Sequence, residues 1–128
     1  MAFISNIKFS ATKTAGVQHS WKVTVKYNAN FTPYELSTGN FRFKDSFAVW
    51  EDDSWPNSDD RVTGEVGGSV FNPTASPTVR TLTYTLTNSE RAIADEIFGE
   101  ELYAVVKLTN IDLNVPYTKK SATLHIDL

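Results

Sequence analysis

The strongest constraint on the fold is a strict alternation of apolar and polar side chains along residues 17–29. Successive side chains of a β-strand point to opposite faces, so this period of two predicts a strand with one face in a core and the other in water. We therefore expect Trp21 to be a core residue. The apolar face carries, in order, Val17, His19, Trp21, Val23, Val25, Tyr27 and Ala29.

The same alternation recurs along the chain and predicts seven strands. In the first strand, we expect Phe3, Ile7 and Phe9 to point into the core. Asp45 interrupts the apolar face of the third strand, which we interpret as a bulge. Tyr103 lies opposite the apolar face of the sixth strand, so we expect both faces of that strand to be covered. The predicted strands are residues 3–11, 17–29, 41–50, 62–71, 79–87, 101–109 and 119–128.

One short helix is predicted between the fifth and sixth strands. Thr87 and Glu90 have the spacing of a capping box, in which the glutamate side chain reaches back to the first turn. Ile93 and Ile97 are four residues apart and would share the buried face of this helix. Gly99 stands where a left-handed residue commonly ends a helix.

The length of 128 residues suits a single domain that spans residues 1–128. So many strands with so little helix predict an all-β fold, a two-sheet antiparallel β-sandwich. In architecture this arrangement resembles immunoglobulin-like or C2-like sandwiches, although the cysteine pair of true immunoglobulin domains is missing. The chain has no cysteine, which excludes a disulfide, a thiolate metal site and a cysteine nucleophile.

Charge and hydropathy argue against two classes of partner. The net charge of −3 gives no reason to expect nucleic-acid binding. No apolar run reaches the ~18 residues that a membrane span needs. No basic segment with a long apolar stretch follows Met1, so we expect a cytoplasmic location by default, and a secreted one stays open.

Acidic side chains gather at one predicted end of the sandwich. If successive strands run up and down, residues 12–16, 51–60 and 88–100 meet there. A hard cation such as calcium takes about six to eight oxygen ligands, which clustered carboxylates supply. The alternatives are a solvated acidic turn and a docking surface for a basic protein. The predicted ligands of a divalent cation are Glu51, Asp52, Asp53, Asp59 and Asp60.

The same loop carries the predicted ligand-binding residues Trp50, Trp55 and Asn57. A tryptophan on a loop can stack on a sugar ring or anchor a protein interface. The alternative is a tryptophan that folds back to cap the sandwich. Amides and aromatic rings also gather at the opposite end, where they suit a saccharide but are equally ordinary turn residues.

Catalysis finds little support, and we expect no enzymatic activity. His19 lies on an apolar strand face, and His125 stands beyond hydrogen-bond reach of Ser121 and Asp127 along one strand. We therefore predict a non-enzymatic binding module for a protein or saccharide ligand, with or without calcium. The alternatives are a structural protein that forms a homo-oligomer or complex through its sheet edges, and a small hydrolase.

Overall fold

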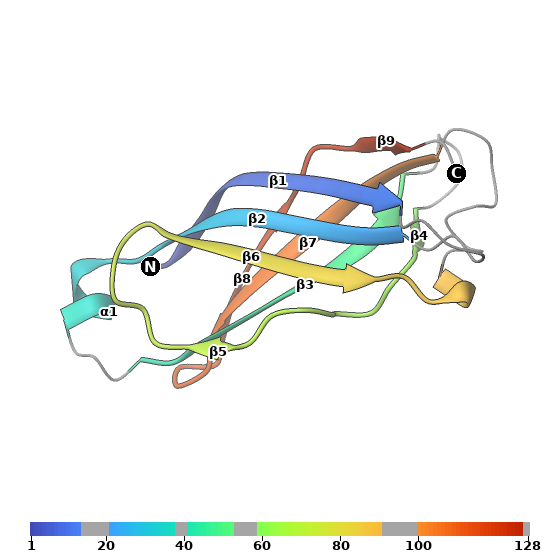
Figure 1. Ribbon diagram of the computed structural model, residues 1–128. Helices are drawn as coiled ribbons and strands as arrows, with labels where there is room; N and C mark the ends of the chain where they lie inside the picture. The colour runs from blue at the N-terminus through green and yellow to red at the C-terminus, as the bar shows by residue number, and fades with distance from the viewer. Residues whose placement is uncertain (14–20, 38–40, 53–58, 91–99, 127–128) are drawn as a thin grey trace.

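The computed structural model describes residues 1–13, 21–37, 41–52, 59–90 and 100–126. Two antiparallel sheets pack face to face along their length (Figure 1). The prediction of an all-β sandwich is confirmed. In the described part of the chain, no helix has the length and hydropathy that crossing a membrane requires.

Sheet A has three strands in the order β1-β2-β6. They are β1 (Phe3–Lys13), β2 (Trp21–Asn30) and β6 (Thr78–Thr85). None of these three strands contains an aspartate or glutamate. Since β1 and β6 each pair only with β2, they form the two edges of this sheet.

Sheet B has the order β4-β3-β7-β8, with β5 also on β3 and β9 also on β7. Its elements are β3 (Phe43–Glu51), β4 (Asp60–Arg61), β5 (Val70–Phe71), β7 (Glu100–Asn110), β8 (Val115–Lys120) and β9 (Leu124–Ile126). Because β4 and β5 pair with the two ends of β3, they act as one interrupted strand, and β8 and β9 do the same along β7. Counted in this way, the described residues form seven strands.

The last strand begins earlier than predicted, at Val115 rather than at residue 119. Pro116 and Tyr117, expected in a loop, therefore lie in β8 and pair with the end of β7. Asn114 has a positive φ of 53°, so the turn that precedes β8 is short and tight.

The core fills the space between the sheets with the inward side chains that the alternation predicts. Trp21 is buried, as expected. The fully buried residues include Val23, Val25, Tyr27, Phe43, Phe47, Val49, Leu102, Val106 and Leu108.

The inward placement of Phe3 is wrong, because a bulge in β1 changes the phase of the alternation. Phe3 is 58% exposed, whereas Ile4 is buried at 5%. The pairing of β1 with β2 shifts by one residue between Ser5 and Lys8. After the shift, Ile7 packs against the core as predicted.

The bulge expected at Asp45 lies in the segment opposite it, since β3 pairs with β7 without a break. On its other side the register shifts by one residue between the Lys44–Val70 and Phe47–Val66 pairs. The Asp45 side chain lies between the sheets with no exposed area. The Tyr27 hydroxyl donates to Oδ2 at 2.8 Å, and Arg80 donates to Oδ2 at 2.8 Å and to Oδ1 at 3.1 Å. The Ser69 main-chain N–H adds a bond to Oδ1 at 3.0 Å. The carboxylate thus ties β3 of sheet B to two strands of sheet A.

Two short helices carry the same capping pattern, of which only one was predicted. Thr87 and Glu90 exchange the expected bonds where residues 88–90 begin a helix. Helix α1 (Pro33–Ser37) was not predicted, although Thr32 and Glu35 form an equivalent capping box. The residues predicted to complete the other helix lie outside the described part of the chain: Ile93, Ile97 and Gly99.

Candidate functional site

The predicted ligand and metal residues lie where β3 ends and β4 begins. Trp50 and Glu51 are the last two residues of β3, and they pair with Arg61 and Asp60 of β4. The two acidic segments therefore run side by side at one end of the sandwich (Figure 1). Three of the predicted residues lie outside the described residues: Asp53, Trp55 and Asn57.

The described carboxylates of this end have different surroundings. Glu51, expected in the solvated segment, lies between the sheets and is only 1% exposed. Asp52 is half-buried, and its main-chain N–H donates to the main-chain oxygen of Glu101 at 2.8 Å. Asp60 is exposed. Over the described ranges, no three His, Asp or Glu side chains form a group that could hold a metal ion. The calcium site stays a prediction, because Asp53 lies outside those ranges.

Asp59 accepts a hydrogen bond from the Tyr103 hydroxyl at 2.7 Å, which joins the start of β4 to β7. Burial raises the pKa of Tyr103 to about 12, helped by the bond to Asp59 and by the charges of Asp59 and Asp52. The Lys120 ammonium lies 3.9 Å from the centroid of the Tyr103 ring. Such a placement over an aromatic face is attractive because the ring face is electron-rich.

Trp50 stands beside Tyr103 on the outer face of sheet B, because the two residues are direct partners in the β3–β7 pairing. The Arg61 guanidinium lies 5.6 Å from the Trp50 ring centroid. Its Nε donates to the main-chain oxygen of Thr63 at 2.8 Å, which fixes the guanidinium over the ring. Two aromatic rings are thus flanked by two cations, one at each side.

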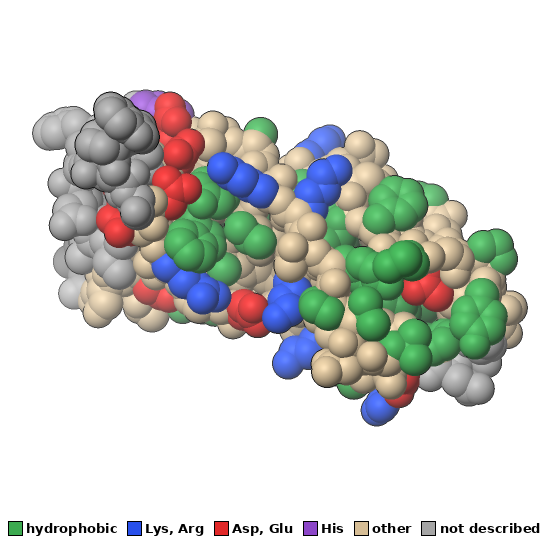
Figure 2. Space-filling model, turned by 180° about the vertical axis from the view of Figure 1, so that it is seen from behind, with side chains coloured by type: hydrophobic (Ala, Val, Ile, Leu, Met, Phe, Trp, Pro, Cys, Tyr) green, Lys and Arg blue, Asp and Glu red, His purple; other side chains and the backbone are tan. Residues whose placement is uncertain are grey.

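A hollow of about 320 Å³ opens next to these rings, and we call it the aromatic hollow. Ala48 and Val105 are direct partners across β3 and β7, so they lie side by side on this face. Lys107 and Glu65 contribute to the rim and form an ion pair at 3.2 Å. Figure 2 shows hydrophobic side chains gathered on this side of the molecule, with basic and acidic side chains around them. The hollow is lined by Ala48, Trp50, Arg61, Glu65, Tyr103, Val105, Lys107 and Thr118.

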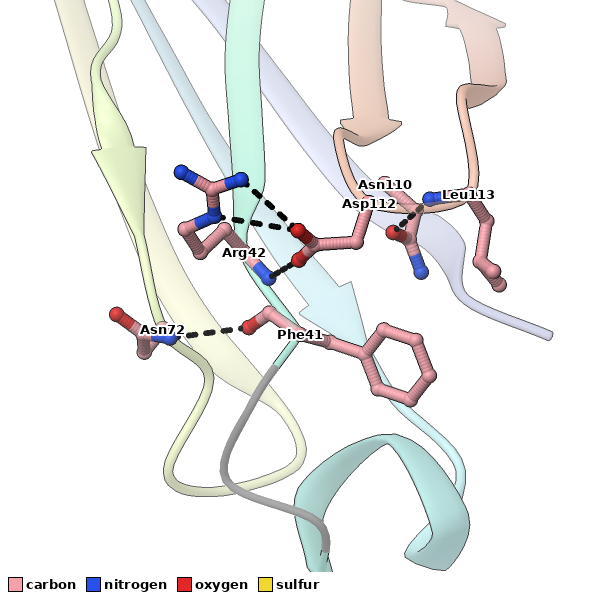
Figure 3. Close-up of polar contacts among 6 residues, drawn as sticks. All are labelled: Phe41, Arg42, Asn72, Asn110, Asp112 and Leu113. Carbon is pink, nitrogen blue, oxygen red and sulfur yellow. Dashed lines mark hydrogen bonds and ion pairs between the residues drawn. The ribbon is translucent and has the colours of Figure 1, made fainter.

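The opposite end, also expected to offer amides and rings, uses its polar groups internally (Figure 3). The Arg42 main chain donates to Asp112 Oδ2 at 2.7 Å, and its side chain donates to Oδ1 at 2.9 Å. These hydrogen bonds lower the pKa of Asp112. The Asn72 amide donates to the main-chain oxygen of Phe41 at 3.1 Å. The ordinary turn chemistry foreseen as the alternative accounts for these contacts.

Aromatic side chains at that end are divided between the core and the surface. Phe31 is buried and packs edge-on against Phe43, with ring centroids 4.8 Å apart. Tyr34 is 67% exposed and packs against Phe41, with ring centroids 5.6 Å apart. None of the three hollows found among the described residues is lined by Tyr34 or Phe41, so this end is a weaker candidate than the paired rings of sheet B.

The serine nearest to His125 in the sequence, Ser121, has a structural role. Ser121 lies at the break between β8 and β9 and is buried. Its hydroxyl accepts the Ala104 main-chain N–H at 2.9 Å and lies 2.9 Å from the Ala122 oxygen, to which it donates. These bonds close the break in the edge strand.

The contribution of Arg61, Tyr103 and Lys120 to a site was not predicted. For Tyr103 a signal was available, namely the apolar residues on both faces of its strand, and the structure confirms that Tyr103 is buried. Arg61 and Lys120 reach the rings only through strand pairings that the sequence does not reveal. No family model, no curated protein and no solved structure matches this chain.

Proposed function

We propose that this chain is a non-enzymatic binding module and that its ligand is a saccharide held in the aromatic hollow. The observation that carries the proposal is the pairing of Trp50 and Tyr103 beside a hollow with both an apolar floor and a charged rim. Small-ligand sites combine apolar and aromatic walls with a few polar groups that fix orientation.

The size and chemistry of the hollow fit one or two sugar rings. Its volume of about 320 Å³ is at the lower end of the ~300–1,000 Å³ typical of small-ligand pockets. Ala48 and Val105 offer a surface for the apolar face of a sugar. Arg61, Glu65 and Lys107 supply donors and acceptors for its hydroxyl groups.

A glycan array probed with the full chain tests this proposal. The wild type should bind a subset of glycans, and Trp50→Ala should lose that binding. Tyr34→Ala is the matched control, since it removes an exposed aromatic ring at the opposite end of the sandwich. An array without a hit, or equal binding by Trp50→Ala, would reject the saccharide ligand.

The role of calcium is a separate part of the proposal. Asp52, Asp59 and Asp60 lie at the end of sheet B where β3 pairs with β4, and Asp53 is the fourth proposed ligand. Thermal melting with and without calcium tests it, because ligand at 100 times Kd should add about 2.7 kcal/mol of stability. An unchanged melting temperature at millimolar calcium would remove the cation and leave the hollow as the site.

A second candidate function is assembly through a sheet edge. β6 lies at the edge of sheet A, and its Val79 side chain is 55% exposed. Open edge strands offer unpaired backbone groups to a neighbouring chain. Light scattering after size exclusion should then show a homo-oligomer, whereas a monomer at all micromolar concentrations would count against self-assembly.

A further inference from the structure

The outer face of sheet A is basic, although the whole chain has a net charge of −3. Lys8, Lys22 and Lys26 point outward and are exposed. The other outward side chains are mainly hydroxyls and amides, as in Thr24 and Asn28. Because β1, β2 and β6 contain no acidic residue, nothing on these strands neutralises the lysines.

The bulge in β1 opens a hollow of about 510 Å³ on this face, which we call the bulge hollow. Asn6 has a φ of 51°, the left-handed backbone that accommodates the extra residue. Bulges often re-aim side chains next to functional sites. The bulge hollow is lined by Asn6, Ile7, Lys8, Lys26, Asn28 and Val79.

Two of the lining side chains repel each other. Lys8 and Lys26 are direct partners in the β1–β2 pairing, so their side chains leave the sheet from neighbouring positions on one face. Like charges placed directly opposite each other destabilise a sheet. Among the described residues, the ion pairs found involve other lysines and arginines. A position that breaks a local stability rule is an expected place for a functional site.

We propose that the bulge hollow binds a phosphate or sulfate group. An oxyanion between Lys8 and Lys26 converts their repulsion into two charge-assisted contacts. The amides of Asn6 and Asn28 supply neutral donors, and Val79 offers an apolar wall to whatever carries the group. This site lies on the opposite face of the sandwich from the aromatic hollow and does not depend on the saccharide proposal.

NMR titration of the ¹⁵N-labelled full chain tests this proposal at constant ionic strength. The probes are inorganic phosphate, inorganic sulfate, and phosphatidylcholine vesicles with or without phosphatidic acid. We expect the amide signals of residues 6–8, 26–28 and 79 to shift in a saturable way. Shifts with the inorganic ions identify the free anion as sufficient, and shifts with phosphatidic acid alone identify a lipid headgroup as the source.

Variants separate a specific site from general attraction to the basic face. Lys26→Gln should weaken binding about tenfold, the loss expected for one charge-assisted hydrogen bond. Lys22→Gln is the matched control, since Lys22 lies roughly 13 Å away along the same strand, beyond the Debye length. Asn6→Gly keeps the backbone that the bulge needs and removes the amide, so it should weaken binding without unfolding the chain.

Two results would overturn the proposal. One is the absence of any shift at the bulge hollow with all of the probes. The other is an equal loss of affinity in Lys22→Gln and Lys26→Gln, which would show that the anion feels only the summed charge of the face. Melting temperatures no lower than that of the wild type ensure that each result reports binding, and Lys26→Gln is expected to melt slightly higher because it relieves the repulsion from Lys8.

Discussion

Asp45 and Asp59 each accept a hydrogen bond from a tyrosine hydroxyl, but one lies between the sheets and the other beside the aromatic hollow. Asp45 is bound by Tyr27, by Arg80 and by a main-chain N–H, and all of these partners come from the protein itself. Asp59 instead bonds to Tyr103, whose buried ring is contacted by the exposed side chain of Lys120 on the outer face of sheet B. The inner cluster (Tyr27, Asp45 and Arg80) ties the two sheets together. The outer cluster (Asp59, Tyr103 and Lys120) lies beside the hollow that we propose as the binding site.

Removing the carboxylate of Asp45 should destabilise the fold most. Asp45→Ala leaves the Arg80 guanidinium and the Tyr27 hydroxyl without their acceptor between the sheets. Breaking a buried ion pair by deleting one partner costs about 3–5 kcal/mol, so the free energy of unfolding should fall by that amount. Urea denaturation measures it. Asp112→Ala removes a carboxylate from an exposed arginine pair and should have a far smaller effect, and equal losses would refute the distinction.

The close approach of Gly68 to the main chain of Asp45 predicts a second loss of stability. Gly68 has a φ of 86°, and a Cβ there would collide with the main-chain oxygen of Asp45. We expect Gly68→Ala to lower the free energy of unfolding by about 1–3 kcal/mol, the range for a residue held in strained backbone. Gly64→Ala is the control, because a Cβ at Gly64 meets nothing within 4 Å. Similar denaturation midpoints for both variants would contradict this explanation.

The outer cluster is expected to respond to alkaline pH. The pKa of Tyr103 is raised to about 12, so the folded state favours its neutral form. This contribution to stability is complete below the unfolded pKa of about 10 and disappears as the pH rises from 10 to 12. In Tyr103→Phe, the fall in stability over that interval should be shallower than in the wild type. Titration of the Tyr103 ring signal by NMR checks the pKa directly, and a midpoint near 10 would contradict it.

The smallest effect is expected at the opposite end of the sandwich. Hydrogen bonds from Arg42 lower the pKa of Asp112, so this pair stabilises the fold above the usual aspartate pKa. The contribution is lost as the pH falls through the lowered pKa. Comparing Arg42→Ala with the wild type over acidic pH should reveal only a slight change, since both side chains are exposed to solvent and salt. A large change in stability would mean that the Arg42–Asp112 pair contributes more than an exposed ion pair should.

Much of the fold was predictable from the sequence because strand burial has a period of two. Trp21 and the residues that follow it in β2 keep to this pattern, and the capping box at Thr87 is visible in the sequence. Phe3 was misplaced because one extra residue in β1 reverses the phase, and nothing in the local pattern marks that residue. The role of the Asp45 carboxylate was not predicted, because its partners Tyr27 and Arg80 come from distant strands.

The candidate site was predictable only in part. The sequence located Trp50 and the carboxylates beside it at one end of the sandwich, and the pairing of β3 with β4 brings Glu51 and Asp60 together. The burial of Glu51 follows from its parity with Val49 in β3, a signal that its place in an acidic run obscured. The aromatic hollow itself depends on the register of four strands, which a single sequence does not specify.

We propose the aromatic hollow as the ligand-binding surface of this chain. A map of amide chemical shifts, recorded while the glycan that binds best on the array is added, tests this location. We expect shifts centred on residues 48–50 and 103–107, with saturation at the affinity that the array suggests. Shifts confined to the opposite end near Tyr34 and Asp112, or no glycan binding at all, would contradict the claim.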